Sequence, residues 1–232
     1  MKRMIFVSAI ILIIASAGTV KGQSDTKETR DVKGFTKVSF GVSGNLYINF
    51  GSEFKVVLEG DRKYLDEIIT EVTGGRLIIK KENWRFHFDE KVTVYVTMPE
   101  IEGLGVSGSG KAEIKDAVKS DDLNLSVSGS GKLYANEISV TNLDCSISGS
   151  GDIILGNGTA SKTGISVSGS GNFTGESVKI NKADIHISGS GNCTCNVTES
   201  LIASVSGSGN VTYEGNPRVD AHVSGSGKVR SR

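Results

Sequence analysis

One tetrapeptide, Ser-Gly-Ser-Gly, recurs at nearly regular intervals along the second half of the chain. A period of about twenty residues is typical of solenoids, in which each repeat is one structural unit. Thirty of the 232 residues are glycine, but the fixed spacing and a hydrophobic fraction of 37% argue against a disordered polymer. The copies, 18 to 21 residues apart, begin at Ser107, Ser128, Ser148, Ser168, Ser188, Ser206 and Ser224.

The residues around each copy alternate in the manner of a β-strand. An apolar β-branched residue precedes every copy, and a second apolar or small residue stands two positions earlier. Alternation resumes after the tetrapeptide, and a third apolar patch closes the longer repeats, as at Val118, Ile138 and Val178. Each repeat is therefore expected to hold a strand, a glycine corner and another strand. The columns before the corner are Val106, Val127, Ile147, Val167, Ile187, Val205, Val223, and Leu104, Leu125, Cys145, Ile165, Ile185, Ala203, Ala221.

A single repeat of this length cannot bury its apolar side, whereas repeats stacked about 4.8 Å apart can pair every strand with its neighbours. The pattern predicts an all-β parallel solenoid with glycines at corners that need positive φ or close backbone approach. The alternative, a phosphate-binding loop, requires a single copy that opens a helix. Side chains that follow the corner should form one column, and its three consecutive asparagines can hydrogen-bond along it. This column is Lys111, Lys132, Asp152, Asn172, Asn192, Asn210 and Lys228.

The region before the repeats, residues 23–103, is also mostly strand-like. The segment from Val42 to Ile48 resembles a shortened corner, where the solenoid could begin. Leu65, Ile68, Ile69 and Val72 are spaced for one face of a helix over 61–72, with Asp61 as its cap and Gly74-Gly75 as its end. We expect this short helical insertion to cover the first rungs. Strands are expected over 32–40, 46–50, 54–58, 77–80 and 92–98.

The first 22 residues have the pattern of a secretory signal peptide. Lys2 and Arg3 precede an apolar run over 4–14, and Ala15-Ser16-Ala17 fits a cleavage site, with 20–22 as a second choice. The run is short for a membrane span, although an uncleaved anchor is the alternative. We expect residues 23–232 to form one exported domain, with irregular rungs over 23–103 and regular repeats over 104–232. Cleavage would leave no stable membrane anchor.

The N-terminal region resembles a known bacterial family. The run Gly34-Phe35-Thr36-Lys37-Val38-Ser39 precedes Val42-Ser43-Gly44, and a segment over 64–69 is followed by Gly75-Arg76-Leu77-Ile78-Ile79 and then by the Gly-Ser-Gly corners. Together these are similar to the auto-transporter adhesin, head GIN domain family, from about Val32 onward. The resemblance implies a right-handed parallel β-helix similar to pectin lyases, export in a Gram-negative bacterium and a role in cell adhesion. The chain departs from auto-transporters because it ends without alternating barrel strands.

The histidines, the aromatic run and the cysteines are the residues to consider first as metal, sugar-binding or redox groups. His186 and His222 point outward two rungs apart, roughly 10 Å, which is too far to share a metal. His87 lies in the aromatic run with Trp84, Phe86 and Phe88, interpreted as a buried strand or cap contact rather than a sugar platform. Cys145, Cys193 and Cys195 fall in inward columns and are interpreted as small core residues, with a metal or redox pair and a bridge to Cys145 as alternatives.

Polysaccharide-cleaving β-helices need clustered carboxylates or carboxylates on calcium. The column three residues before the β-branched position contains no two acids on adjacent rungs. The acidic pair Asp121-Asp122 resembles a turn. We therefore assign no catalytic, cofactor-binding or metal residue. The column reads Asn124, Asp144, Gly164, Asp184, Ile202, Asp220.

The function predicted from the sequence is non-enzymatic. The chain has 26 basic and 26 acidic side chains, and this balance excludes an electrostatically held nucleic-acid partner. We expect an exported protein, in the periplasm or at the cell surface, that binds glycans or other surface components through repeated shallow contacts. The alternatives are a pectin-lyase-like polysaccharide-processing enzyme and a periplasmic structural protein. The ligand, the oligomeric state and the choice between periplasm and surface are left open.

Overall fold

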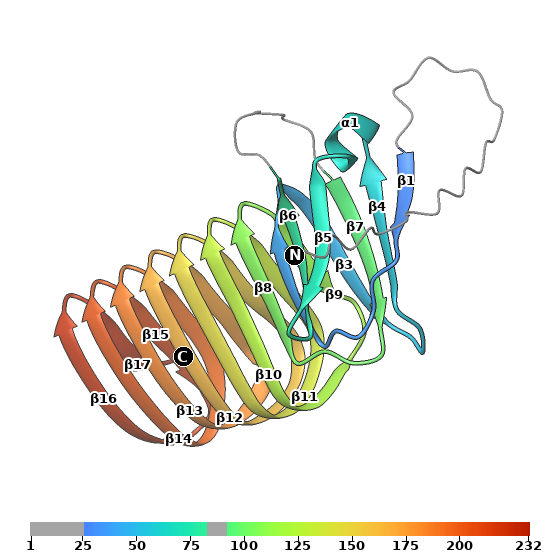
Figure 1. Cartoon of the computed structure of the whole chain (residues 1–232). Helices are drawn as coiled ribbons and strands as arrows, with labels where there is room; N and C mark the ends of the chain where they lie inside the picture. Colours follow the sequence, from blue (N-terminus) through green and yellow to red (C-terminus); the bar gives the residue numbers. More distant parts are fainter. Residues whose placement is uncertain (1–25, 83–91) are drawn as a thin grey trace, which may run out of the picture.

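The computed structural model describes residues 26–82 and 92–232, and these residues form a stack of β-strands (Figure 1). The expected signal peptide and the aromatic run at Trp84, Phe86, His87 and Phe88 lie outside the described residues. The predicted parallel β-solenoid is confirmed. Its regular part contains β8 (Gly103–Gly108), β9 (Lys111–Ile114), β10 (Val118–Gly129), β11 (Lys132–Gly149), β12 (Asp152–Gly169), β13 (Asn172–Gly189), β14 (Asn192–Gly207), β15 (Asn210–Glu214), β16 (Arg218–Gly225) and β17 (Lys228–Ser231).

The repeats stack in register, with corresponding residues of successive rungs side by side. Ser148 of β11 pairs with Ser128 of β10 on one side and with Ser168 of β12 on the other. The same register continues through Ser188 and then to Ser206. All these pairings are parallel, as expected for strands joined by a full turn of the chain.

The two glycines of each tetrapeptide serve different purposes. Gly149 has a φ of 116°, which side chains other than glycine rarely adopt. At Gly151 the reason is space, because a Cβ atom would lie 2.4 Å from the carbonyl oxygen of Gly131 and 2.4 Å from Cγ1 of Val127. The adjacent amide of Asp152 donates a 3.0 Å hydrogen bond to that same carbonyl. Positive φ and close backbone approach, both expected at the corner, are thus divided between its two glycines.

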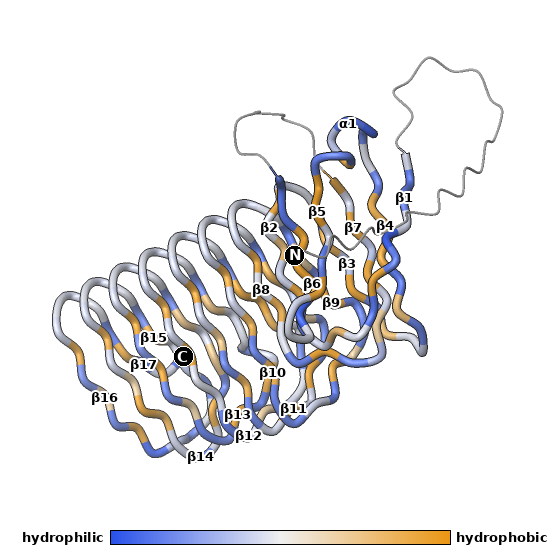
Figure 2. Tube along the Cα trace, viewed as in Figure 1, coloured by the Kyte–Doolittle hydropathy of each residue, from blue (hydrophilic) through white to orange (hydrophobic). Residues whose placement is uncertain are grey.

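The core runs along the stack between the inner faces of the rungs. The alternating positions predicted from the sequence are buried, as Leu125, Val127 and Leu133 illustrate for one rung. Hydrophobic segments recur at equivalent places in successive rungs (Figure 2). The three predicted patches at Val118, Ile138 and Val178 are buried as well. Burial of these columns stabilises the stack by about 25 cal/mol for each Å² of apolar surface removed from water.

The N-terminal rungs do not follow chain order in space. In the described chain, β2 lies between β6 and β8, and β3 lies between β7 and β9, all in parallel pairings. The chain therefore forms a rung with β2 and β3, moves outward to β6 and β7, and returns to the other side at β8. Gly44 lies at the shortened corner predicted here and has a φ of 142°. The bounds are β2 (Lys37–Gly41), β3 (Gly44–Phe50), β6 (Arg76–Lys81) and β7 (Val92–Met98).

The helix predicted over 61–72 is much shorter in the structure. Helix α1 (Arg62–Leu65) has Asp61 as its N-cap, and the Asp61 Oδ1 accepts a 2.8 Å hydrogen bond from the backbone N–H of Lys63. Residues Ile68–Thr73 form strand β5, which pairs antiparallel with β6. The expected helix was wrong there because the β-branched run favours a strand and Gly74-Gly75 forms a hairpin turn, both glycines having positive φ.

Antiparallel strands lie at the end of the stack beyond β7. Strand β4 (Lys55–Gly60) pairs antiparallel with β7, and β1 (Thr26–Arg30) pairs antiparallel with β4. Together with α1 and β5, they lie at the end opposite β16 (Figure 1). The two ends of the stack therefore differ, because β16 is the last strand of a purely parallel series.

Candidate binding surface

The strand segments just before each corner present a regular polar surface, which we call the serine face. Its outward side chains alternate with the buried columns, and most are small and exposed. In-register stacking aligns them in rows that run along the solenoid. The central members are Asn124, Ser126, Asp144, Ser146, Gly164, Ser166, Asp184 and His186.

A hollow of about 460 Å³ interrupts the serine face. Gly164 lines it and pairs with Asp144 on one side and with Asp184 on the other. A Cβ atom at Gly164 would lie 2.7 Å from Oδ1 of Asp144, so this carboxylate extends over the position of the missing side chain. The prediction that no two acids lie on adjacent rungs holds in this column, yet both carboxylates border one hollow.

The predicted outward histidines have different surroundings. His186 Nε2 lies 3.2 Å from Oδ1 of Asp184, with side chains 62% and 55% exposed respectively. His222 lies two rungs away, since both histidines pair with Ser204. Among the described residues, no group of three or more His, Cys, Asp or Glu side chains is arranged to hold a metal ion.

The column after the corner forms the predicted hydrogen-bonded ladder. Asn210 donates to Asn192, Asn192 to Asn172, and Asn172 to Asp152, each with a nitrogen–oxygen distance of 3.0 Å. The other oxygen of Asp152 lies 2.8 Å from the Lys132 ammonium. Burial acts to raise the pKa of Asp152, but the bonds from Lys132 and Asn172 outweigh it and the pKa is lowered. This column stabilises the stack and leaves few of its polar atoms for a ligand.

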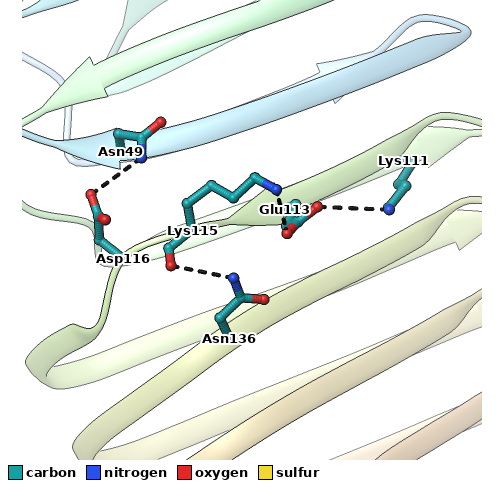
Figure 3. A network of polar contacts seen from close by, with 6 residues as sticks. All are labelled: Asn49, Lys111, Glu113, Lys115, Asp116 and Asn136. Atoms are coloured by element: carbon teal, nitrogen blue, oxygen red, sulfur yellow. Dashed lines mark hydrogen bonds and ion pairs between the residues drawn. The ribbon is translucent and has the colours of Figure 1, made fainter.

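A second polar network lies on the outer face of β9 (Figure 3). Glu113 lies between Lys115, at 2.6 Å, and Lys111, at 3.7 Å. The hydrogen bond from Lys115 lowers the pKa of Glu113, which keeps its carboxylate charged. The two ammonium groups also contact aromatic rings, Lys115 at 4.8 Å from the Tyr47 centroid and Lys111 at 4.5 Å from the Tyr134 centroid. The sequence did not reveal this network, because its residues lie in or next to β3, β9 and β11, which are not consecutive in the chain.

The three cysteines are buried and free, as expected for small core residues. Burial raises the pKa of the Cys145 thiol. A hydrogen bond with Cys195, together with burial, raises the pKa of the Cys193 thiol. Thiols held in their protonated form are poor nucleophiles and poor metal ligands. The cysteines therefore belong to the core and do not contribute to the outer faces.

The fold and its surfaces define a class: a parallel β-solenoid with repeated polar outer faces and a shallow hollow. The sequence matches the family described as putative auto-transporter adhesin, head GIN domain, over residues 34–217, and the chain belongs to this family. The resemblance drawn from the sequence is thereby confirmed. No curated protein matches the sequence.

Solved structures of bacterial proteins have the same fold. A putative adhesin from Bacteroides fragilis is 24% identical with a TM-score of 0.84, over 91% of this chain and 98% of that one. A putative lipid binding protein from Parabacteroides distasonis is 22% identical with a TM-score of 0.74, over 90% and 97%. A putative adhesin from Parabacteroides merdae is 22% identical with a TM-score of 0.72, over 90% and 96%. At these identities the likeness is one of fold.

Proposed function

We propose that this chain is an exported, non-enzymatic adhesin that binds glycans on a cell surface through its serine face. Residues 1–22 would be removed during export, leaving residues 23–232 as a single domain. The family to which the chain belongs supports an adhesive role and an exported or surface location. Within the described residues, no helix has the length and apolarity required to cross a membrane.

The observation that carries the proposal is the hollow around Gly164. Asp144, Asp184 and His186 border it, with the serine rows beside them. Carboxylates accept hydrogen bonds from sugar hydroxyls, and serine hydroxyls both donate and accept them. The hollow is shallow, so one site would bind weakly. Adhesion would then depend on several contacts made at once along the stack and between neighbouring molecules.

Binding to arrays of host and bacterial glycans tests this proposal. Gly164→Leu would fill the hollow, and the displaced atom would be the flexible end of Asp144 rather than backbone. We expect the purified protein to bind a subset of glycans and Gly164→Leu to reduce that binding at least tenfold. Thr194→Leu places a leucine at an outward position of β14 away from the hollow and should leave binding unchanged. Equal binding by all three proteins would contradict the assignment of the hollow.

The two carboxylates at one hollow also favour a second candidate, a polysaccharide-cleaving enzyme. Their strands are separated by one rung, and inverting glycosidases place two carboxyl groups about 6.5–9.5 Å apart. However, Asp184 is more than half exposed, an open environment unlike the sheltered site of a general acid. Release of reducing ends from the glycans that bind, abolished by Asp144→Asn, would support this alternative. Binding without release would support the adhesin.

A further inference from the structure

Strand β16, in the C-terminal rung, exposes side chains at positions that are buried in β14, the strand beside it. Val219 and Val223 are each 38% exposed, whereas Leu201 and Val205, which pair with them from β14, are 0% and 1% exposed. All eight residues of β16 are exposed. In the described chain, β16 pairs with β14 along one edge, and no strand pairs with its other edge. The hydrogen-bonding groups along its other edge are therefore open to a further strand.

This edge contrasts with the opposite end of the stack, where β1, β4 and β5 lie in antiparallel pairings beside the rungs. A long exposed strand edge promotes pairing with another chain. Figure 1 shows β16 at the outer end of the series, with no neighbouring strand beyond it among those described. The edge and the exposed valines together form an interaction surface, which we call the β16 edge (Arg218–Gly225).

We propose that the β16 edge pairs antiparallel with the same edge of a second copy, with the two-fold axis at Ala221. In this register Val219 lies opposite Val223 of the second copy, and Ala221 lies opposite its own equivalent. On the outer face, Asp220 lies opposite His222 of the second copy. The sequence from 219 to 223, Val-Asp-Ala-His-Val, is thus complementary to itself when reversed. An isologous interface of this kind closes as a dimer.

The other registers are less favourable. An axis at Asp220 would place two aspartates opposite each other and bring Arg218 opposite His222. An axis at His222 would place two histidines together and leave Asp220 opposite Ser224. An axis between two residues would set inward side chains against outward ones, because side chains alternate along a strand. Like charges directly opposite each other destabilise a strand pair, whereas Asp220 opposite His222 allows a hydrogen bond between carboxylate and imidazole, so the Ala221 register is favoured.

The dimer would also restore burial at the end of the core. Val219, Ala221 and Val223 lie in the inward columns, and a two-fold axis perpendicular to the sheet keeps inward residues of both copies on the same side. Each copy contributes the terminal rung formed by β16 and β17, Arg218–Ser231, which has fewer residues than the 20–30 per side of a standard interface and is typical of a weak dimer. The partner is therefore a second copy of this chain, and the inference does not depend on which ligand the serine face binds.

Cysteine cross-linking tests the register directly. Opposite Cα atoms of an antiparallel pair lie about 4.5–5.5 Å apart, within the range of a disulfide. Under mild oxidation Ala221→Cys should form a covalent dimer. Val219→Cys and Val223→Cys should each remain monomeric when oxidised alone, since their own equivalents lie four residues out of register, but the two proteins mixed should cross-link. The parent protein is the control, because its three cysteines are buried and free.

Exchanging Asp220 and His222 provides an independent test. Sedimentation velocity would be run at protein concentrations from about 1 µM to 1 mM, which cover the dissociation constants of weak dimers. Asp220→His and His222→Asp should each weaken dimerisation at least tenfold, and the double exchange should restore it to within threefold of the parent. A parent that is monomeric throughout, an Ala221→Cys protein that does not cross-link, or covalent homodimers of Val219→Cys would overturn the proposal.

Discussion

Replacing the second glycine of a corner tests whether the rungs are stacked as closely as described. In Gly151→Val the new Cβ would lie 2.4 Å from the Gly131 carbonyl oxygen and 2.4 Å from Val127 Cγ1. A side-chain rotation at residue 151 relieves neither contact, because the backbone fixes the position of Cβ, and the Gly131 oxygen is itself a backbone atom. The rungs must separate locally by about an ångström to reach ordinary van der Waals distance.

The free-energy cost has two parts. Overpacking a closely packed site typically costs about 1–3 kcal/mol. Separating the rungs also weakens the hydrogen bonds from Asp152 N to Gly131 O, 3.0 Å, and from Asn172 N to Gly151 O, 3.2 Å. Each such bond contributes about 1 kcal/mol. The sum is roughly 3–5 kcal/mol, which corresponds to a fall in Tm of roughly 6–20 °C for a domain of this size.

Thermal unfolding followed by circular dichroism measures the effect, with two controls. Ser150→Val adds the same side chain at the adjacent exposed position and should change stability by less than about 0.5 kcal/mol. Gly108→Ala has no atom within 4 Å of the new Cβ but a φ of 91°, so it isolates the backbone cost of about 1–3 kcal/mol. Equal melting temperatures for Gly151→Val and Ser150→Val would refute the close stacking of the corners.

Three further perturbations test contacts inside the rungs and along the ladder. Thr163→Val should raise Tm by a few degrees in calorimetry, because a methyl group replaces a buried hydroxyl that has no hydrogen-bond partner in the described chain. Asn192→Ala should lower stability by about 1–2 kcal/mol in urea unfolding, since it removes one donor and one acceptor from the ladder. Acidification should destabilise the protein as Asp152 becomes protonated, and Asp152→Asn should reduce this dependence in melts recorded across pH.

The sign of the pH effect follows from the lowered pKa of Asp152. Its contribution is complete above the ordinary aspartate pKa of 3.8 and is lost as pH falls through the lower folded value. A pH profile unchanged by Asp152→Asn would contradict this assignment. A lower Tm for Thr163→Val would indicate that the hydroxyl is satisfied, and an unchanged stability for Asn192→Ala would show that the ladder adds nothing. Thr141→Val, at an exposed position, is the control for Thr163→Val.

The regular repeats could be predicted in detail because one short sequence motif, repeated in each rung, determines their geometry. The spacing of the tetrapeptide set the register, as Ser128, Ser148 and Ser168 show. Alternation assigned the inward columns, and the asparagines after the corner indicated a ladder that the structure contains. Each of these predictions depends only on contacts between equivalent residues of adjacent repeats, so the same prediction applies to each regular rung.

The N-terminal region and the hollow could not be predicted in the same way. The position of β2 between β6 and β8 depends on pairings between segments about 40 to 65 residues apart, which no local pattern encodes. Residues Ile68–Thr73 have both helical spacing and β-branched side chains, and pairing with β6 decides between them. The hollow at Gly164 could not be predicted, because a glycine in one rung forms part of a hollow only through the position of its neighbours. Here the Asp144 side chain on the adjacent rung extends across Gly164.

The most direct test of the adhesive function is whether the protein is accessible from outside intact cells. Unpermeabilised cells would be treated with protease or with an antibody against the protein, with a periplasmic protein as the control for envelope integrity. The account predicts that this protein is cleaved or labelled while the control stays protected. Protection of both proteins, with labelling only after permeabilisation, would place the chain inside the envelope and contradict the adhesive function.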